Sequence, residues 1–304
     1  MQYFILGGTG FVGRFLVKYL LDHGESVTAL VRDESRLKIN APGLELIKGD
    51  PLKQGDWQSA ILNSDVVINL VGSPIMINWT EKAKEIILSS RVDSSANVVD
   101  ALRQSPPKTF ICANAVGYYG PRGDETVNEH EGPGTDFLSE VAVKWQEAAM
   151  GAGNFGHRVV ISRFPAVLGP NGGALAQMLP IFKFGLGGKL GSGRQWFPWV
   201  HINDLVRALH FLGTSNEING PVNICSPGTV TNARFTKALA RALNRPALFM
   251  VPGFGLRIFY GEVANMLLSG QRCIPKVLDD AGFEFKFEDI DSALADIIEK
   301  WRSR

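Results

Sequence analysis

Cysteine is scarce in this sequence. Only three of the 304 residues are cysteines, and Cys112, Cys225 and Cys273 lie far apart, odd in number and without the spacing of metal ligands. This pattern excludes a disulfide framework and a zinc site. We therefore expect no bound metal ion, and a protein that works in a reducing cytoplasm.

An excess of charge and long apolar runs are also absent. Lys and Arg total 31 against 30 Asp and Glu, so the net charge of +1 gives the chain no global attraction toward nucleic acid or an anionic membrane. No apolar run approaches the roughly 18 residues that a spanning helix requires. We expect neither a nucleic-acid nor a membrane partner, and the sequence identifies no protein partner.

What the sequence does have is a hydrophobic content of 45%, arranged in apolar runs that alternate with longer amphipathic stretches. The strand-length runs are residues 3–6, 27–31, 44–47, 66–70, 109–113 and 159–161, with helical stretches near 11–23, 80–103 and 136–150. This alternation predicts βαβ units and an α/β fold, a doubly wound parallel sheet covered by helices on both faces. We assign it to residues 1–170.

The pattern changes after about Pro170. A Gly-rich stretch over 185–193 leads into shorter elements, and the C-terminal part from Phe235 to Trp301 is mainly helical by periodicity. We predict a smaller, mainly helical C-terminal lobe over residues 171–304 that carries the substrate site. Elements near 203–225 are expected to return to the first sheet.

Gly7-x-x-Gly10-x-x-Gly13 stands where the first expected strand meets the first expected helix. Gly7 permits a tight turn, Gly10 lets the backbone approach a pyrophosphate, and Gly13 lets the helix pack closely on the strand. The helix N-terminus then offers free N–H groups and a favourable dipole to the phosphates. We predict a dinucleotide site that includes Gly7, Thr9, Gly10, Phe11, Val12 and Gly13; the alternative is a glycine turn without a ligand.

The second expected strand ends at Val31, followed by Arg32 and Asp33. A site that prefers NAD usually places a carboxylate at this strand end to bind the ribose hydroxyls, whereas this sequence places Val31 there and a guanidinium next to it. Arg32 can pair with a 2′-phosphate, which favours NADP(H). Alternatively Arg32 is a solvated loop residue, and Asp33 either neutralises it in part or turns outward.

Two further strand ends are expected at the same edge of the sheet. Asp50 follows the third strand and either reaches the adenine or caps the turn before Pro51. Leu70, Val71 and Gly72 close the fourth strand, and their backbone is expected to line the cofactor.

The motifs together carry a family resemblance. The chain resembles the extended short-chain dehydrogenase/reductases, which include nucleotide-sugar epimerases. The resemblance rests on Gly7–Gly13, Asn69–Gly72, Tyr118-Tyr119-Gly120 and Arg163 followed by 168–170. Segments 115–120, 172–174, 185–188, 191–196, 199–202 and 231–233 resemble the atypical "epimerase family", often labelled cell-division-inhibitor-related. The resemblance implies a Rossmann-type domain that binds NADP(H) and a small C-terminal domain. By the same resemblance, Val167 lies beside the nicotinamide; Arg91 points either toward the phosphates or into solvent.

The sequence departs from the chemistry of that family, which uses a Tyr-x-x-x-Lys pair to exchange a proton with the substrate. The helix expected to carry the pair has Glu140 and Lys144 at this spacing, and Asn114 stands where a hydroxyl is expected. Glu140, Lys144, Asn114 and Tyr118 are our candidates for catalysis; Tyr119 in place of Tyr118, or a substrate that needs no proton from the protein, are the other possibilities. Their alternatives are a surface ion pair for Glu140 and Lys144, and aromatic packing for Tyr118.

Segment 191–201 combines a cation, an amide, two indoles and an imidazole, a set that suits a small-molecule cleft. We expect Arg194, Gln195, Trp199 and His201 to bind substrate. For His201 the alternative is a buried imidazole near a helix start, because Asp204 is close by. Family nucleotide-sugar epimerases place a diphosphate-binding arginine at the position that Phe197 occupies here, which disfavours a nucleotide sugar.

Two functions follow from these observations. The first is an NADP(H)-binding oxidoreductase or nucleotide-sugar-epimerase-like enzyme that acts on an unidentified small molecule without the usual Tyr/Lys pair. The second is a cofactor-bound regulatory or interaction protein that does not turn over, linked to cell division as the family label suggests.

Overall fold

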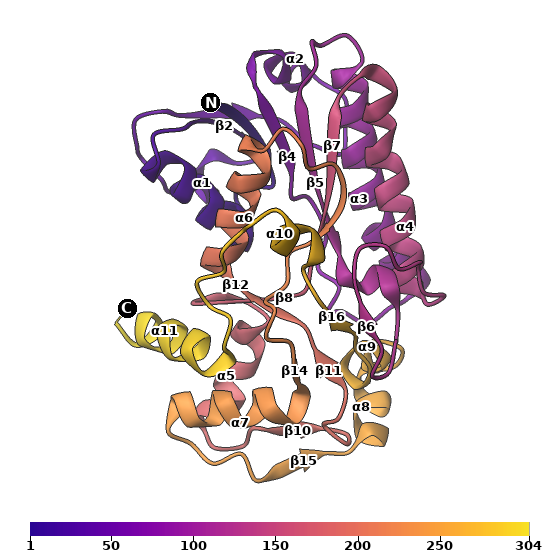
Figure 1. Ribbon diagram of the computed structural model, residues 1–304, viewed down its shortest axis with the longest axis vertical. Helices are drawn as coiled ribbons and strands as arrows, with labels where there is room; N and C mark the ends of the chain where they lie inside the picture. The colour runs from indigo at the N-terminus through magenta and orange to yellow at the C-terminus, as the bar shows by residue number, and fades with distance from the viewer. Residues whose placement is uncertain (304) are drawn as a thin grey trace.

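A seven-stranded parallel sheet organises the computed structural model, which describes residues 1–303 (Figure 1). Its order is β13-β7-β5-β4-β1-β2-β3, and every neighbouring pair is parallel. The strands are β1 (Gln2–Leu6), β2 (Ser26–Val31), β3 (Leu44–Lys48), β4 (Val66–Asn69), β5 (Thr109–Ala115), β7 (Arg158–Phe164) and β13 (Gly220–Asn223). The predicted doubly wound α/β fold is confirmed.

Helices cover both faces of this sheet, which explains why its central strands are apolar on both sides. On one face α1 (Phe11–Asp22) and α6 (Ile202–Thr214) pack on Tyr3 and Ile5. On the other face α3 (Glu81–Leu102) and α4 (Phe137–Met150) pack on Phe4 and Leu6. Alternate residues of β1 therefore face opposite cores, as the period of a strand dictates.

Shorter elements connect these layers. They are the helix α2 (Trp57–Ala60), the 3₁₀ turns η1 (Glu34–Arg36), η2 (Ile61–Asn63), η3 (Val116–Tyr119) and η4 (Gly151–Phe155), and the strand β6 (Thr126–Val127). β6 pairs with β16 (Arg272–Cys273), so the C-terminal part of the chain contacts the first sheet's periphery.

The C-terminal lobe lies below the sheet in Figure 1. Its helices are α5 (Leu175–Lys183), α7 (Asn232–Leu243), α8 (Gly253–Tyr260), α9 (Val263–Leu268) and α11 (Ile290–Arg302). The short helix α10 (Lys276–Asp280) lies instead beside the large sheet, where Leu278 joins the core that includes Val222 of β13. Its short strands are β8 (Ala166–Gly169), β9 (Gly172–Gly173), β10 (Gly188–Leu190), β11 (Trp196–Phe197), β12 (Trp199–His201), β14 (Val230–Thr231) and β15 (Phe249–Val251). These strands form small sheets of two or three strands rather than a second large sheet.

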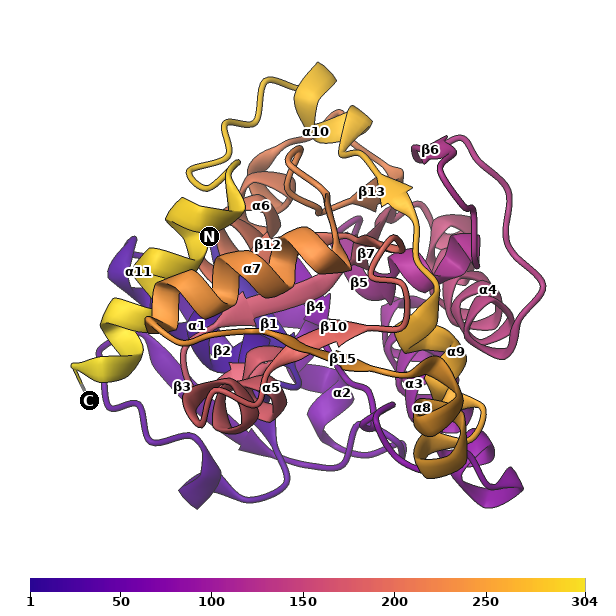
Figure 2. The same cartoon turned by 90° about the horizontal axis from the view of Figure 1, so that it is seen from below.

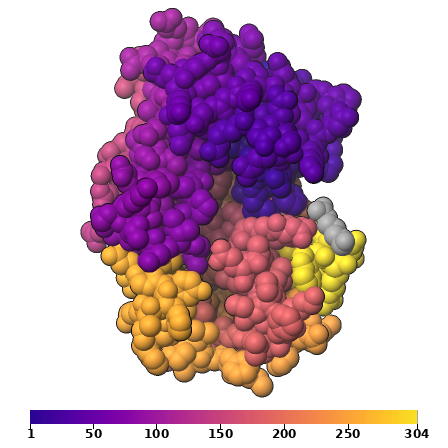
Figure 3. Space-filling model, turned by 180° about the vertical axis from the view of Figure 1, so that it is seen from behind, coloured from indigo at the N-terminus to yellow at the C-terminus, as the bar shows by residue number. Residues whose placement is uncertain are grey.

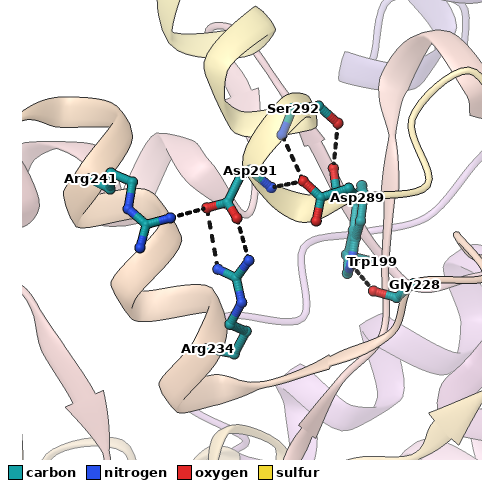
Figure 4. Close-up of polar contacts among 7 residues, drawn as sticks. All are labelled: Trp199, Gly228, Arg234, Arg241, Asp289, Asp291 and Ser292. Atoms are coloured by element: carbon teal, nitrogen blue, oxygen red, sulfur yellow. Dashed lines mark hydrogen bonds and ion pairs between the residues drawn. The ribbon is translucent and has the colours of Figure 1, made fainter.

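Helices α7 and α11 of the lobe share one apolar core and one ion-pair cluster (Figure 4). Asp291 accepts hydrogen bonds from both Nη atoms of Arg234, and its Oδ1 lies 3.4 Å from Nη1 of Arg241. Asp289 caps the start of α11 by accepting from the N–H groups of residues 291 and 292. The cluster therefore holds α11 against α7 at its first turn.

Two elements of the C-terminal half return to the first sheet. β13 pairs with β7 at the sheet edge, and α6 packs beside α1. The buried carboxylate of Asp204, in the first turn of α6, accepts from the backbone N–H groups of Lys286 and Phe287. Within residues 1–303, no helix combines the length and the hydropathy that crossing a membrane would require.

Candidate functional site: a dinucleotide cleft at the sheet edge

The loop between β1 and α1 has the geometry that its three glycines predict. Gly7 has a φ of +83°, which favours glycine, and a Cβ there would lie 2.9 Å from the backbone of Leu70. A Cβ on Gly13 would lie 2.3 Å from the carbonyl oxygen of Gly7, so any side chain would separate helix from strand. Both glycines therefore serve close packing.

Gly10 is different, because a Cβ on it would meet protein only at the Gly7 carbonyl, 3.2 Å away. It is the N-cap of α1, carries no capping side chain, and is followed by no acidic residue in the first turn. The N–H groups at the start of α1 thus have no side-chain cap, which is the arrangement that binds phosphate.

The ring of the neighbouring Phe11 lies against the turn from β8 to β9, where a Cβ on Gly172 would come within 2.1 Å of it. Thr9 and Val12 are half-buried in the same loop. The glycines at 172 and 173, part of the family resemblance, therefore make room for Phe11.

The carboxyl end of β4 forms the opposite wall. The buried Asn69 accepts from the N–H of Val71 and donates to the hydroxyls of Ser94 and Ser95 on α3, which fixes the path of residues 70–72. Leu70 is tied to β1 through its N–H. The structure thus brings the 70–72 backbone next to the glycine loop, as the sequence predicts for parallel strand ends.

Arg91 of α3 lies at this same edge with its guanidinium beside Gly72, where a Cβ would be 3.1 Å from Cζ. It donates to the carbonyls of Ile87 and Ser73 and stacks 5.2 Å from the ring centroid of Trp145. No carboxylate within residues 1–303 pairs with it, and burial lowers its pKa to about 10. A half-buried cation without an anion beside a phosphate-type loop fits the pyrophosphate of a dinucleotide.

At the adenosine end, the buried Val31 closes β2 and the exposed Arg32 follows it. Asp33 does not face Arg32: its carboxylate caps η1 by accepting from the N–H and hydroxyl of Ser35. These hydrogen bonds, with smaller contributions from Arg36 and Lys48, lower the pKa of Asp33. Asp33 is therefore held by Ser35, and Arg32 pairs with no carboxylate in the described residues.

Two exposed cations that the sequence analysis did not select accompany Arg32. Lys48 ends β3 in register with Val31, and Arg36 lies in η1, where its carbonyl accepts from Arg14. Lys48 could have been selected from the sequence, because it stands at the end of the third expected strand as Val31 does at the end of the second. Asp50, by contrast, accepts from the N–H of Leu52, which is the turn cap offered as the alternative to an adenine contact.

The four candidates for catalysis differ in their contacts. Lys144 and Glu140 form an ion pair of 2.6 Å between side chains that are 48% and 60% exposed, the geometry of the surface alternative. Asn114 is buried, with its amide nitrogen bonded to the carbonyl of Ala142. Neither arrangement presents a proton donor to the cleft.

Tyr118 has a different environment. Its ring lies over the guanidinium of Arg163, 3.6 Å from Cζ to the ring centroid, and edge-on to Tyr119. Arg163 is fully buried and donates to the Tyr119 hydroxyl and to Gln146. The Tyr119 hydroxyl donates in turn to the side-chain oxygen of Asn223, and the backbone N–H of Asn223 donates to the carboxylate of the buried Glu129. Burial raises the pKa of the Glu129 carboxyl group. The hydrogen bonds hold Arg163 in place, and its guanidinium in turn orients the Tyr118 ring.

The residues proposed to bind substrate are mostly engaged inside the lobe. Gln195 donates to the carbonyls of Leu190 and Leu267, and Trp199 is buried with Nε1 donating to the carbonyl of Gly228 (Figure 4). Arg194 is exposed. Val167 of β8 is half-buried, and its carbonyl accepts from the N–H of Ala174.

His201 is a buried N-cap. Its Nδ1 accepts from the N–H of Asn203, so Nε2 carries the proton and donates to Asp296 at 3.1 Å, while the ring stacks on Phe287. Burial lowers its pKa to about 4, which keeps the imidazole neutral. Both ring nitrogens are occupied, and the imidazole lies between α6 and α11, the geometry of the alternative in which His201 is a buried imidazole near a helix start.

The space-filling view shows a hollow between the indigo-to-purple N-terminal part and the pink part of the lobe (Figure 3). The profile of the NAD dependent epimerase/dehydratase family matches residues 3–225. This chain belongs to that family. A domain of unknown function matches residues 251–297.

Relatives that span the whole chain extend this assignment. An epimerase family protein of Staphylococcus haemolyticus is 37% identical over 98% of this chain and 99% of its own length. A chloroplastic SDR39U1 homologue of Arabidopsis thaliana is 35% identical over 97% of this chain and 86% of its own. This epimerase/dehydratase-family chain is thus an NAD(P)-binding protein with relatives of the SDR39U1 type.

Solved structures agree with the fold. The human epimerase family protein SDR39U1, crystallised with NADPH, is 31% identical, with a TM-score of 0.86 over 98% of this chain and 99% of the human one. A nucleoside-diphosphate sugar epimerase of Corynebacterium glutamicum is 32% identical, with a TM-score of 0.78 over 98% of this chain and 58% of the other. A UDP-glucose 4-epimerase of Thermotoga maritima, 17% identical, shares the fold alone, with a TM-score of 0.81 over 100% of this chain and 99% of that one.

Proposed function

We propose that this chain is an NADP(H)-dependent oxidoreductase or epimerase-like enzyme that acts on a small molecule. The observation that carries the choice of NADP(H) is the end of β2: Val31 is buried, Arg32 is exposed, and the carboxylate of Asp33 is bonded to Ser35 rather than to Arg32. The strand end itself thus offers a ribose 2′-hydroxyl no carboxylate, whereas a 2′-phosphate would find a cation beside it. The NADPH bound by human SDR39U1 supports the same choice.

Each part of the cleft has a role in this proposal. The N–H groups at the start of α1 and the Arg91 guanidinium would bind the pyrophosphate, and Arg32, with Lys48 and Arg36 nearby, would bind the 2′-phosphate. A bound nicotinamide supplies hydride transfer. The 70–72 backbone and Val167 would border the nicotinamide half.

Tyr118 is the proton-transfer candidate that the geometry favours. A phenol can donate and accept a proton, and the Arg163 guanidinium stacked on its ring holds it in one orientation. Glu140 and Lys144 are instead bonded to each other at the surface, and an amide such as Asn114 cannot shuttle a proton. Turnover in this proposal therefore depends on a tyrosine that lies outside the usual motif.

The rival function is a cofactor-bound regulatory protein without turnover. The specific observation in its favour is that Lys144, Asn114 and His201 are all bonded within the protein, so no second group assists Tyr118. Slow or absent NADPH oxidation with common carbonyl compounds is expected under both functions. The two differ once a substrate is found, because Tyr118→Phe should then lower the rate roughly 10²–10⁴-fold without changing NADPH affinity.

Calorimetric titration with NADPH and NADH tests the cofactor. We expect NADPH to bind at least about tenfold more tightly, and Arg32→Ala to remove about 1.4 kcal/mol of that preference. Arg103→Ala, an exposed arginine near the end of α3, is the matched control and should leave both affinities unchanged. Equal affinities in the unmutated protein would refute the role of Arg32.

A further inference from the structure

The lobe exposes an unusual number of large apolar side chains at its end farthest from the sheet. On α8, Phe254, Ile258 and Phe259 are 70%, 75% and 85% exposed. Leu248 beside β15 is 88% exposed, and Phe184 at the end of α5 is 77% exposed. We call the exposed apolar side chains of residues 181–186, 248–250 and 254–260 the apolar patch. Single exposed apolar residues are ordinary, but a set of this density marks an interaction surface.

These segments are neighbours in space. β10 and β15 pair in parallel, from Gly188 opposite Phe249 to Leu190 opposite Val251. Arg245, just before β15, donates to the carbonyl of Lys183 at the end of α5, and α8 follows β15 directly. Figure 2 looks at this end of the molecule, with α5, β10, β15 and α8 on the near side. The apolar patch is therefore one surface rather than scattered side chains.

Charge is segregated in the same part of the chain. Residues 171–202 and 226–261 contain eight Lys and Arg and no Asp or Glu, although the whole chain is nearly neutral. Lys183, Arg245 and Arg257 are exposed beside the apolar patch, and none pairs with a carboxylate within residues 1–303. The whole-chain balance that argued against an anionic membrane thus conceals a local excess of Lys and Arg beside the patch. Of the eight cations, Arg234 and Arg241 pair with Asp291, and the next carboxylate along the chain, Glu262 after α8, pairs with Lys84.

We propose that the apolar patch, with Lys183, Arg245 and Arg257, docks the protein on an anionic lipid bilayer. Phe254 and Ile258 lie one turn apart on α8, and Phe259 follows, so several side chains can enter the interface together while the cations stay at the headgroups. A second copy fits poorly, because a two-fold interface would oppose the cations beside the patch to one another. The docking is peripheral and needs no spanning helix.

Vesicle sedimentation of the full chain tests this docking. We expect binding to vesicles of phosphatidylcholine with phosphatidylglycerol, weaker binding to phosphatidylcholine alone, and loss of binding as salt rises. The double variant Phe254→Ser/Phe259→Ser should bind anionic vesicles at least about tenfold more weakly, since it removes two inserted rings. Arg257→Glu should weaken binding severalfold, and only to the anionic vesicles.

Leu62→Ser is the matched control, an exposed leucine in η2 outside the patch, and should leave vesicle binding unchanged. Unaltered NADPH affinity in every variant verifies that each still folds. Three results would overturn the proposal: no binding of the unmutated chain to anionic vesicles, equal binding by the double variant, or equal binding to neutral vesicles. A dimer that the double variant disrupts, with no vesicle binding, would assign the patch to a second copy instead.

Discussion

The β1–α1 loop and the segment from Gly191 to His201 are the two densest motifs of the chain, and the structure uses them in opposite ways. In the loop, the N-terminus of α1 has no side-chain cap and the Arg91 guanidinium has no carboxylate partner within residues 1–303. In the segment, Gln195, Trp199 and His201 are all bonded to other parts of the protein. We therefore base the candidate site on unfilled bonding capacity rather than on a concentration of polar and aromatic residues.

The largest effect is expected from a substitution in the β1–α1 loop. Gly10→Val should weaken NADPH binding at least about 100-fold, because the branched side chain would occupy the space of the pyrophosphate. The fold should persist, since a Cβ at this position approaches protein only at the Gly7 carbonyl, 3.2 Å away. Calorimetry for binding and thermal unfolding for stability measure the two halves of the prediction.

Two other glycines make this result interpretable. Gly255→Ala, in open space on α8, should leave NADPH binding unchanged and should not lower stability, because alanine favours a helix over glycine by up to about 1 kcal/mol. Gly13→Val should instead unfold the protein at lower temperature, because its Cβ would lie 2.3 Å from the Gly7 carbonyl. NADPH affinity that survives Gly10→Val would place the dinucleotide elsewhere.

The second prediction concerns the segment from Gly191 to His201. It measures how much His201 contributes to the free energy of unfolding. Burial lowers its pKa from 6.5 to about 4, so the unfolded state binds more protons between these values. The contribution of His201 to the free energy of unfolding is present above about pH 6.5 and is lost as pH falls toward 4, by roughly 3 kcal/mol. Urea unfolding across this range should show a shallower pH dependence for His201→Asn, which retains a capping acceptor. Parallel curves would mean that His201 does not titrate with unfolding.

Most of the fold could be predicted from the sequence, because strand spacing and apolar runs are local properties. All seven strands of the large sheet were expected within a few residues, including the return of β13. The partners of single side chains could not be predicted in this way. Nothing near His201 in the sequence identifies Asp296, which comes 95 residues later, and nothing near Tyr118 identifies Arg163 as the cation beneath its ring. Asp50 was the exception, since the turn that it caps is local and the cap was one of the two alternatives that the sequence offered.

The third prediction separates Arg91 from Arg32. Arg91→Met should weaken NADPH and NADH alike, by about tenfold or more, because the pyrophosphate is common to both cofactors. Arg32→Ala should affect mainly NADPH. Calorimetry of both variants with both cofactors gives the comparison, and apo-protein melting curves verify the fold. Selective loss of NADPH binding in Arg91→Met would move Arg91 to the 2′-phosphate.

The smallest effect is expected at Glu140 and Lys144, although their spacing is that of the family's catalytic pair. Their ion pair lies between exposed side chains four residues apart, an interaction that stabilises a helix by only a few tenths of a kcal/mol. Glu140→Gln and Lys144→Met should therefore leave NADPH affinity and thermal unfolding almost unchanged. Once a substrate is known, both variants should also retain turnover while Tyr118→Phe loses it. A rate that falls by two orders of magnitude in Glu140→Gln, with NADPH affinity intact, would make this carboxylate the proton-transfer group and would show that an exposed, internally bonded pair can still serve the cleft.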